Sequence, residues 1–92
     1  MSLIDEARVK INEIDKKMVE LFEERMKAVL DVLEYKKQHN LPVFDEKREK
    51  ELLERVSELA GEELNDYCRE LYEKIMEISR DYQQDYFNKE VR

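Results

Sequence analysis

The sequence predicts an all-α domain, a bundle of three helices. The chain has 92 residues, which is the length of one domain. It is 45% charged, contains one glycine and one proline, and is rich in glutamate, lysine, leucine and isoleucine. This mixture favours long helices and provides almost no turns between strands. We expect one domain over residues 1–92, with helices at about 2–38, 45–60 and 64–87.

The composition also excludes several classes of protein. The sequence contains no run of about 18 apolar residues, the length needed to span a membrane. The N-terminus lacks the basic and apolar regions of a signal peptide. The net charge of −7 argues against nucleic acid or an anionic membrane as the main partner. The single cysteine, Cys68, cannot form an internal disulfide, which fits a reducing compartment. We expect a soluble, cytoplasmic protein without nucleic-acid or membrane partners.

The first helix is predicted by a long segment free of glycine and proline. Its apolar and charged residues recur at steps of three and four along one face, here called the first-helix stripe. The stripe consists of Ile4, Arg8, Ile11, Asp15, Met18, Phe22, Arg25, Val29, Val32 and Lys36. Pro42 disfavours helix at the residue before it, and basic residues precede the break, as is typical of a helix C-terminus.

The second and third helices follow from the same periodicity. The second is expected to end at Gly61, a usual terminating residue. Its expected buried residues are Leu52, Leu53, Val56 and Leu59. The third is expected to carry an apolar stripe of Leu64, Cys68, Leu71, Ile75, Ile78 and Tyr82. A second stripe on the third helix is partly polar and consists of Tyr72, Met76, Ser79 and Gln83.

The length of the first helix predicts how the chain assembles. About 36 residues at a rise of about 1.5 Å per residue make a helix roughly 54 Å long. A compact domain of this size has a radius of gyration of about 12 Å and is roughly 30 Å across. The two shorter helices can therefore cover only part of the first-helix stripe. An intertwined homodimer built on paired first helices would cover the rest, so we expect a homodimer.

Four of the ten stripe positions are charged: Arg8, Asp15, Arg25 and Lys36. A single polar residue on such a stripe is ordinarily a register-setting or snorkelling residue, and Asp15 is expected to pair with a stripe cation and fix register. Three cations together on one stripe of an acidic protein indicate instead a binding site for an anion.

Helix geometry limits which cations can share one ligand. Arg25 and Lys36 share a face and lie roughly 16 Å apart along the axis, which suits a small dianion between their side chains. Arg8 lies about 26 Å from Arg25 and cannot reach that ligand on its own chain. In an antiparallel dimer, however, Arg8 of one subunit can approach the Arg25–Lys36 interval of the other. Arg48, which stands at an unfavourable position near a helix N-terminus, would add a further cation.

Together these features resemble the all-helical class of chorismate mutases over nearly the whole chain. The resemblance is carried by Arg8, the stretch IDKKMVELFEER ending at Arg25, Lys36, the run PVFDEKREKELLERV, and ISRDYQQ. It implies a dimer of intertwined three-helix chains with two identical, shared active sites, and chorismate as the substrate.

The resemblance also implies which residues bind the two substrate carboxylates. Arg8 from the partner subunit, Arg25 and Lys36 would bind them. Ser79 would support the carboxylate held by Arg25, and Arg48 would add positive charge.

The remaining implied roles concern the ring hydroxyl and the ether oxygen. Glu49 and the backbone at Asp45 would hold the hydroxyl, and Lys36 and Gln83 would donate hydrogen bonds to the ether oxygen. The three catalytic residues are thus expected to be Lys36, Gln83 and Arg25. The family often has a small residue three positions before the lysine, where this chain has Leu33.

The implied chemistry agrees with the residue types present. Rearrangement of chorismate to prephenate occurs within one molecule, so it requires no nucleophile, metal or cofactor, and the sequence carries no metal-ligand spacing. Two alternatives stay open: an isochorismate-pyruvate lyase of the same fold, and a non-catalytic helical dimerisation or regulatory module. The D-x-x-R-E start of the second helix favours the mutase over the lyase, because Glu49 suits a ring hydroxyl.

Overall fold

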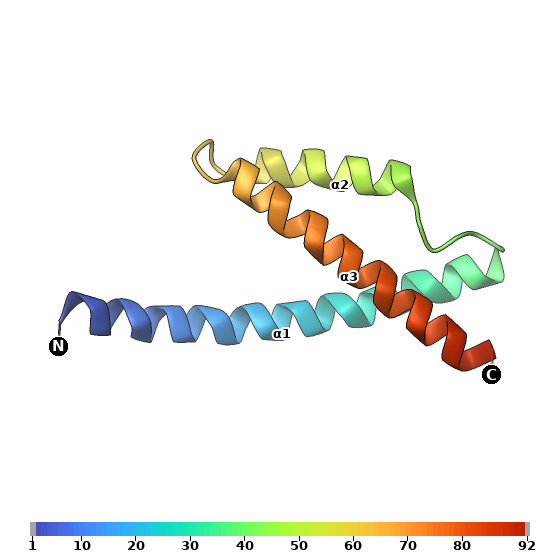
Figure 1. The fold of residues 1–92 in the computed structure, drawn as a ribbon, viewed down its shortest axis with the longest axis horizontal. Coiled ribbons are helices and arrows are strands. Elements are labelled where there is room, and N and C mark those ends of the chain that lie inside the picture. Colours follow the sequence, from blue (N-terminus) through green and yellow to red (C-terminus); the bar gives the residue numbers. More distant parts are fainter. Residues whose placement is uncertain (1, 92) are drawn as a thin grey trace.

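The protein consists of three α-helices (Figure 1). The computed structural model describes residues 2–91, and no strand occurs among them. The helices are α1 (Leu3–Gln38), α2 (Glu46–Leu59) and α3 (Asn65–Val91). The prediction of an all-α fold is therefore confirmed. The third helix continues four residues beyond the expected end at residue 87.

Local capping explains where α1 begins and ends. The Ser2 side chain accepts a hydrogen bond from the Asp5 backbone N–H at 3.2 Å, which satisfies one of the free donors of the first turn. At the other end, Asn40 adopts a left-handed conformation with φ of 53°. The Leu41 N–H then donates to the Lys36 carbonyl at 2.8 Å, closing the helix as a Schellman motif. Pro42 prevents the helix from resuming.

A side-chain cap begins α2, and an extended residue ends it before the short segment that leads to α3. Asp45 caps α2 by accepting from the Arg48 backbone N–H at 3.1 Å. The helix ends at Leu59, and Ala60 is already extended, with φ of −82° and ψ of 149°. Gly61 follows the cap but does not adopt a positive φ. Gly61 therefore has the expected position directly after the cap, but it does not adopt the left-handed conformation usual there, because Ala60 has already turned the chain away from the helix axis.

The third helix joins the other two. It packs along α2 and crosses the C-terminal half of α1, whereas the N-terminal half of α1 extends away from both (Figure 1). The apolar core is correspondingly small. It consists of Leu33, with 2% of its surface exposed, Val56 and Met76.

One expected buried residue is exposed, and the two stripes of α3 have different surroundings. Leu59 is 74% exposed instead of buried, and it is the last residue of α2, next to the turn that leads to α3. On α3 the second stripe, with Met76, Ser79 and Gln83 buried, faces the rest of the chain. The expected apolar stripe of α3 is largely exposed, at Leu64, Leu71, Ile78 and Tyr82. A single stripe of α3 can face the angle between α1 and α2, and the partly polar stripe occupies it.

The chain is much more extended than a compact domain of its mass. Its radius of gyration is 16.7 Å and its longest dimension is 55 Å, against about 12 Å for a compact chain of this length. It exposes 7813 Å², whereas a folded monomer of 11.3 kDa exposes about 5,700 Å². The expectation that α1 reaches well beyond the rest of the chain is confirmed.

Candidate active site

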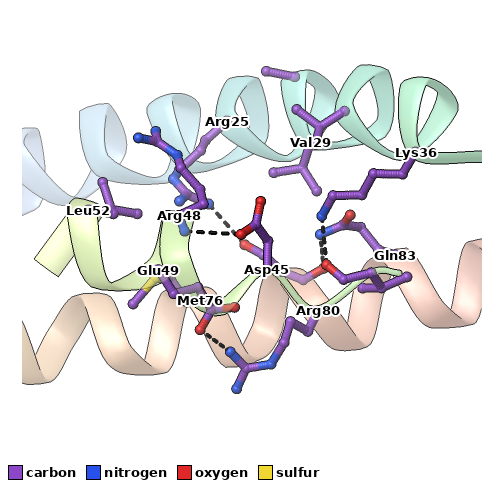
Figure 2. Close-up of a pocket in the computed structure, with 14 residues that line it drawn as sticks. Arg25, Val29, Lys36, Asp45, Arg48, Glu49, Leu52, Met76, Arg80 and Gln83 are labelled. Atoms are coloured by element: carbon purple, nitrogen blue, oxygen red, sulfur yellow. Dashed lines mark hydrogen bonds and ion pairs between the residues drawn. The ribbon is translucent and has the colours of Figure 1, made fainter. Parts of the chain in front are cut away.

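A cavity of about 270 Å³ lies where the three helices converge (Figure 2). It forms because α1 and α2 both pack against α3 but not against each other. Its volume is close to the lower end of the range for small-molecule sites. The cavity is lined by Arg25, Ala28, Val29, Val32, Lys36, Val43, Asp45, Arg48, Glu49, Leu52, Met76, Ser79, Arg80 and Gln83.

The lining carries positive charge in an acidic protein. Four cationic side chains and two carboxylates line the cavity, so its formal charge is +2, whereas the chain as a whole carries −7. Because like charges gathered at one site repel each other, this concentration of cations favours an anionic ligand.

Arg25 is held in the cavity by α3. Its Nη1 donates to the Ser79 Oγ at 2.9 Å, and that hydroxyl donates in turn to the Ile75 carbonyl at 2.8 Å. Ser79 is only 6% exposed, so its orientation is fixed by packing as well as by hydrogen bonds. The guanidinium uses one of its five N–H donors on Ser79, which leaves the others available to a ligand.

Lys36 is held from the opposite side by the segment that precedes α2. Its Nζ donates to the Val43 carbonyl at 2.6 Å. Burial lowers the pKa of Lys36 below its ordinary value of 10.5, and the nearby carboxylates of Asp45 and Glu49 oppose that shift. Within residues 2–91 this half-buried ammonium makes a single hydrogen bond, so it is well placed to stabilise a negative charge.

Gln83 is a buried amide with unused hydrogen-bonding capacity. It is 6% exposed, and its Nε2 donates to the Ser79 carbonyl at 3.2 Å. Its Oε1 is buried and has no partner among the described residues, and one Nε2 hydrogen is also unused there. An unpaired buried polar atom costs about 1–3 kcal/mol, so this side chain indicates that a polar ligand completes the site.

The first turn of α2 supplies the remaining charged groups. The Asp45 carboxylate caps the helix, and Glu49 forms an ion pair with Arg80 of α3. The Arg48 side chain is exposed and has no hydrogen-bond or ion-pair partner within residues 2–91. Arg48 is therefore a cation at the cavity edge that no carboxylate of the described chain neutralises by direct contact.

The structure brings together seven of the eight predicted site residues. Arg25, Lys36, Asp45, Arg48, Glu49, Ser79 and Gln83 all line the cavity. Arg8 does not, because it lies on the projecting half of α1 and is exposed. This position agrees with the estimate that Arg8 cannot reach the cavity of its own chain.

Sequence reasoning missed Arg80 and the Val43 carbonyl. Arg80 could have been found, because it follows Met76 by four residues and therefore belongs to the second stripe of α3. The role of the Val43 carbonyl depends on how the connecting segment folds, which no side-chain pattern reveals. Leu33 lines a neighbouring cavity of about 540 Å³ between the end of α1 and α3 and not the cationic cavity, so it does not narrow the latter.

The described residues lack both a metal site and a membrane-spanning helix. Residues 2–91 contain no group of three or more histidine, cysteine, aspartate or glutamate side chains placed to hold a metal ion. Within the same residues, no helix combines the length and apolar character needed to cross a membrane.

Known proteins match this chain over most of its length. A bifunctional chorismate mutase/prephenate dehydratase of Buchnera aphidicola is 42% identical over 74 residues, covering 78% of this chain and 19% of that protein. A chorismate mutase of Methanocaldococcus jannaschii is 42% identical over 57 residues, covering 62% of this chain and 58% of that protein. This chain therefore matches less than two thirds of either curated relative.

The fold is also similar to a solved structure. A conserved hypothetical protein from Pyrococcus furiosus superposes with a TM-score of 0.74 at 34% identity, covering 90% of this chain and 97% of that one. The chorismate mutase type II family matches residues 7–84, which include both the cationic cavity and Arg8. The chain belongs to the chorismate mutase type II family.

Proposed function

We propose that the chain is a cytoplasmic chorismate mutase, which converts chorismate to prephenate for the synthesis of phenylalanine and tyrosine. The observation that carries the proposal is the convergence of Arg25, Lys36 and Arg48 on one cavity of formal charge +2. Chorismate carries two carboxylates, so its charge complements the cavity. The names of the two curated relatives support the same activity.

Substrate binding depends on the charged side chains that line the cavity. Arg25, oriented by Ser79, binds one carboxylate, and Lys36 contributes to the binding of the two carboxylates. Arg48 adds positive charge at the edge. Glu49 and the backbone at Asp45 hold the ring hydroxyl at the start of α2. Groups fixed in this way hold a flexible substrate in its compact, reactive conformation, which lowers the entropic part of the barrier.

No protein group forms a covalent bond to the substrate in the chemical step. One carbon–oxygen bond breaks and one carbon–carbon bond forms within the same molecule, while negative charge grows on the ether oxygen. Lys36 and the unused Nε2 hydrogen of Gln83 donate to that oxygen. The Gln83 Oε1 is then free to accept a hydrogen bond from a neighbouring donor, which would satisfy the buried atom. Preorganised donors of this kind contribute about 3–4 kcal/mol each to the transition state.

We further propose that the active unit is an intertwined homodimer. The chain exposes about 2,100 Å² more than a compact monomer of its mass, which is the scale of surface that stable homodimers bury. Much of the exposed apolar surface lies on the projecting half of α1, at Leu3, Ile4, Val9, Ile11, Ile14, Met18, Val19 and Leu21. Pairing of these halves in antiparallel orientation would bring Arg8 of each subunit to the cavity of the other.

The experiment that tests this proposal is a direct assay. Chorismate is added to the purified chain, and its loss and the formation of prephenate are followed by absorbance and chromatography. We expect turnover by a species whose mass, measured by sedimentation equilibrium, is twice that of one chain. Turnover of isochorismate to salicylate and pyruvate in place of chorismate would favour the lyase. A folded dimer that converts neither substrate would identify a non-catalytic module.

A further inference from the structure

Arg80 lies at the junction of three segments and has no role in the function proposed above. It belongs to α3, directly after Ser79, and its side chain lines the cationic cavity. Its Nη1 forms an ion pair with the Glu49 Oε1 of α2, and both side chains are half-buried. Its guanidinium also lies over the ring of Phe44, 5.4 Å from the ring centre. Arg80 therefore fixes α3 to both the first turn of α2 and the segment before it.

The ion pair determines which cation Glu49 contacts. Figure 2 shows Glu49 and Arg80 meeting on the α3 side of the cavity, whereas the Lys36 ammonium lies nearer to Gln83. Glu49 is nevertheless close enough to Lys36 to raise the pKa of its ammonium group. Without Arg80, the Glu49 carboxylate would lose its direct partner, and Lys36 would be a candidate to replace it.

A direct ion pair between Glu49 and Lys36 would weaken the contacts to both the ring hydroxyl and the ether oxygen of the substrate. It would remove Glu49 from the ring hydroxyl and would neutralise the ammonium that faces the ether oxygen. The charged groups around Lys36 come from every neighbouring element: Arg25 from α1, Asp45 from the connecting segment, Arg48 and Glu49 from α2, and Arg80 from α3. Among these, only the Arg80–Glu49 pair is a direct ion pair within the described chain.

We propose that Arg80 is a positioning residue that holds Glu49 against α3 and keeps it from pairing with Lys36. The aromatic ring of Phe44 holds the Arg80 guanidinium in place through a cation–π contact. The proposal rests on the function proposed above, because it assigns Arg80 an effect on turnover that passes through Glu49 and Lys36.

Three variants distinguish positioning from simple stabilisation. Arg80→Ala removes the ion pair, and Arg69→Ala is the matched control. Arg69 is also an α3 arginine that bonds to α2, through the Ser57 Oγ at 3.0 Å, but it does not line the cavity. Arg80→Lys keeps the charge and tests rescue.

The first measurement is steady-state kinetics on chorismate. A hydrogen bond to a charged group is worth about 1.5–3 kcal/mol, so Arg80→Ala should lower kcat roughly tenfold to a hundredfold. Arg69→Ala and Arg80→Lys should stay within about threefold of the wild type. In a Glu49→Gln background, Arg80→Ala should have little further effect, because Arg80 acts through Glu49. Full additivity of the two substitutions would overturn the proposal.

The second measurement does not depend on activity. Titration of Lys36, followed by NMR of a chain labelled at the lysine side-chain carbon next to Nζ, should give a higher pKa in Arg80→Ala than in wild type or Arg69→Ala. An unchanged Lys36 pKa in Arg80→Ala would overturn the proposal. If the wild type does not convert chorismate, the proposed function fails, and the titration still decides whether Arg80 keeps Glu49 from Lys36.

Discussion

The two halves of α1 have the same sequence pattern and different surroundings. From residue 3 to residue 21 every side chain is exposed, whereas from Phe22 onward the stripe is half-buried at most positions. The C-terminal half crosses α3 and lines the cationic cavity. The N-terminal half has the same apolar spacing and no element of its own chain against it (Figure 1).

The difference shows what a helical period can predict. The period identifies the face of a helix that will be covered, but it does not identify what covers it. In the C-terminal half the stripe cation Arg25 bonds to Ser79 of α3. In the N-terminal half the corresponding cation, Arg8, has no partner within residues 2–91. The exposed half therefore needs a second chain, and this requirement can be tested.

The largest expected effect comes from placing a charge on the exposed stripe. Met18→Asp should convert the dimer to monomer and abolish turnover, because an unpaired carboxylate in an apolar interface is strongly unfavourable. The measurement is sedimentation equilibrium with a parallel chorismate assay. Lys16→Asp, nearly opposite on the helix, is the control and should remain dimeric. A Met18→Asp chain that stays dimeric would show that this half of α1 is not an interface.

The next largest effect concerns the covered half. Lys36→Ala should lower kcat by roughly a hundredfold to a thousandfold, because it removes a preorganised cation from the ether oxygen. The dimer mass and the circular dichroism spectrum should be unchanged. Lys27→Ala is the control, since Lys27 is exposed on the same half of α1 and does not line the cavity. Retained turnover in Lys36→Ala would refute the proposed mechanism.

Much of the fold could be predicted from the sequence. The scarcity of glycine and proline and the helical period predicted three helices, because these signals are local. The conformation at Gly61 and the exposure of Leu59 could not be predicted, because they depend on how α2 meets α3. Which of the two stripes of α3 faces the rest of the chain could not be predicted for the same reason. Ser79 and Gln83, from the partly polar stripe, occupy the angle between the helices.

The cations of the site were predicted from charges on an apolar stripe, whereas the roles of its other residues were implied by the resemblance to chorismate mutases. Arg25 and Lys36 stood out because an apolar stripe does not ordinarily carry cations. Arg80 did not stand out, because its partner Glu49 lies 31 residues away and the pairing depends on tertiary structure. The unpaired Gln83 Oε1 is likewise visible only after folding.

A smaller effect is expected from pH. The pKa of Lys36 lies below 10.5 because burial disfavours its charged form. Turnover requires the charged form, so kcat/KM should fall as pH rises through this lowered pKa. In Lys36→Arg any remaining activity should lack this alkaline limb, because arginine stays protonated. If kcat/KM instead fell with a midpoint at or above pH 10.5, while circular dichroism showed an intact fold, the role assigned to Lys36 would be contradicted.

The smallest effect is expected at Phe44. Phe44→Ala removes the ring beneath Arg80, a contact worth about 0.5–1 kcal/mol, so kcat should fall roughly twofold to fivefold. Phe44→Tyr keeps an aromatic face and should retain wild-type kinetics. Equal kinetics in Phe44→Ala and Phe44→Tyr would indicate that the ring does not help to hold Arg80.

The central claim is that each site combines the covered half of one α1 with the exposed half of another. It is tested most directly by mixing Arg8→Ala and Lys36→Ala chains after unfolding and refolding them together. Each mixed dimer should contain one intact site and one doubly altered site, so an equal mixture should recover about a quarter of wild-type turnover. Activity no higher than the mean of the two separate variants would contradict a site shared between subunits.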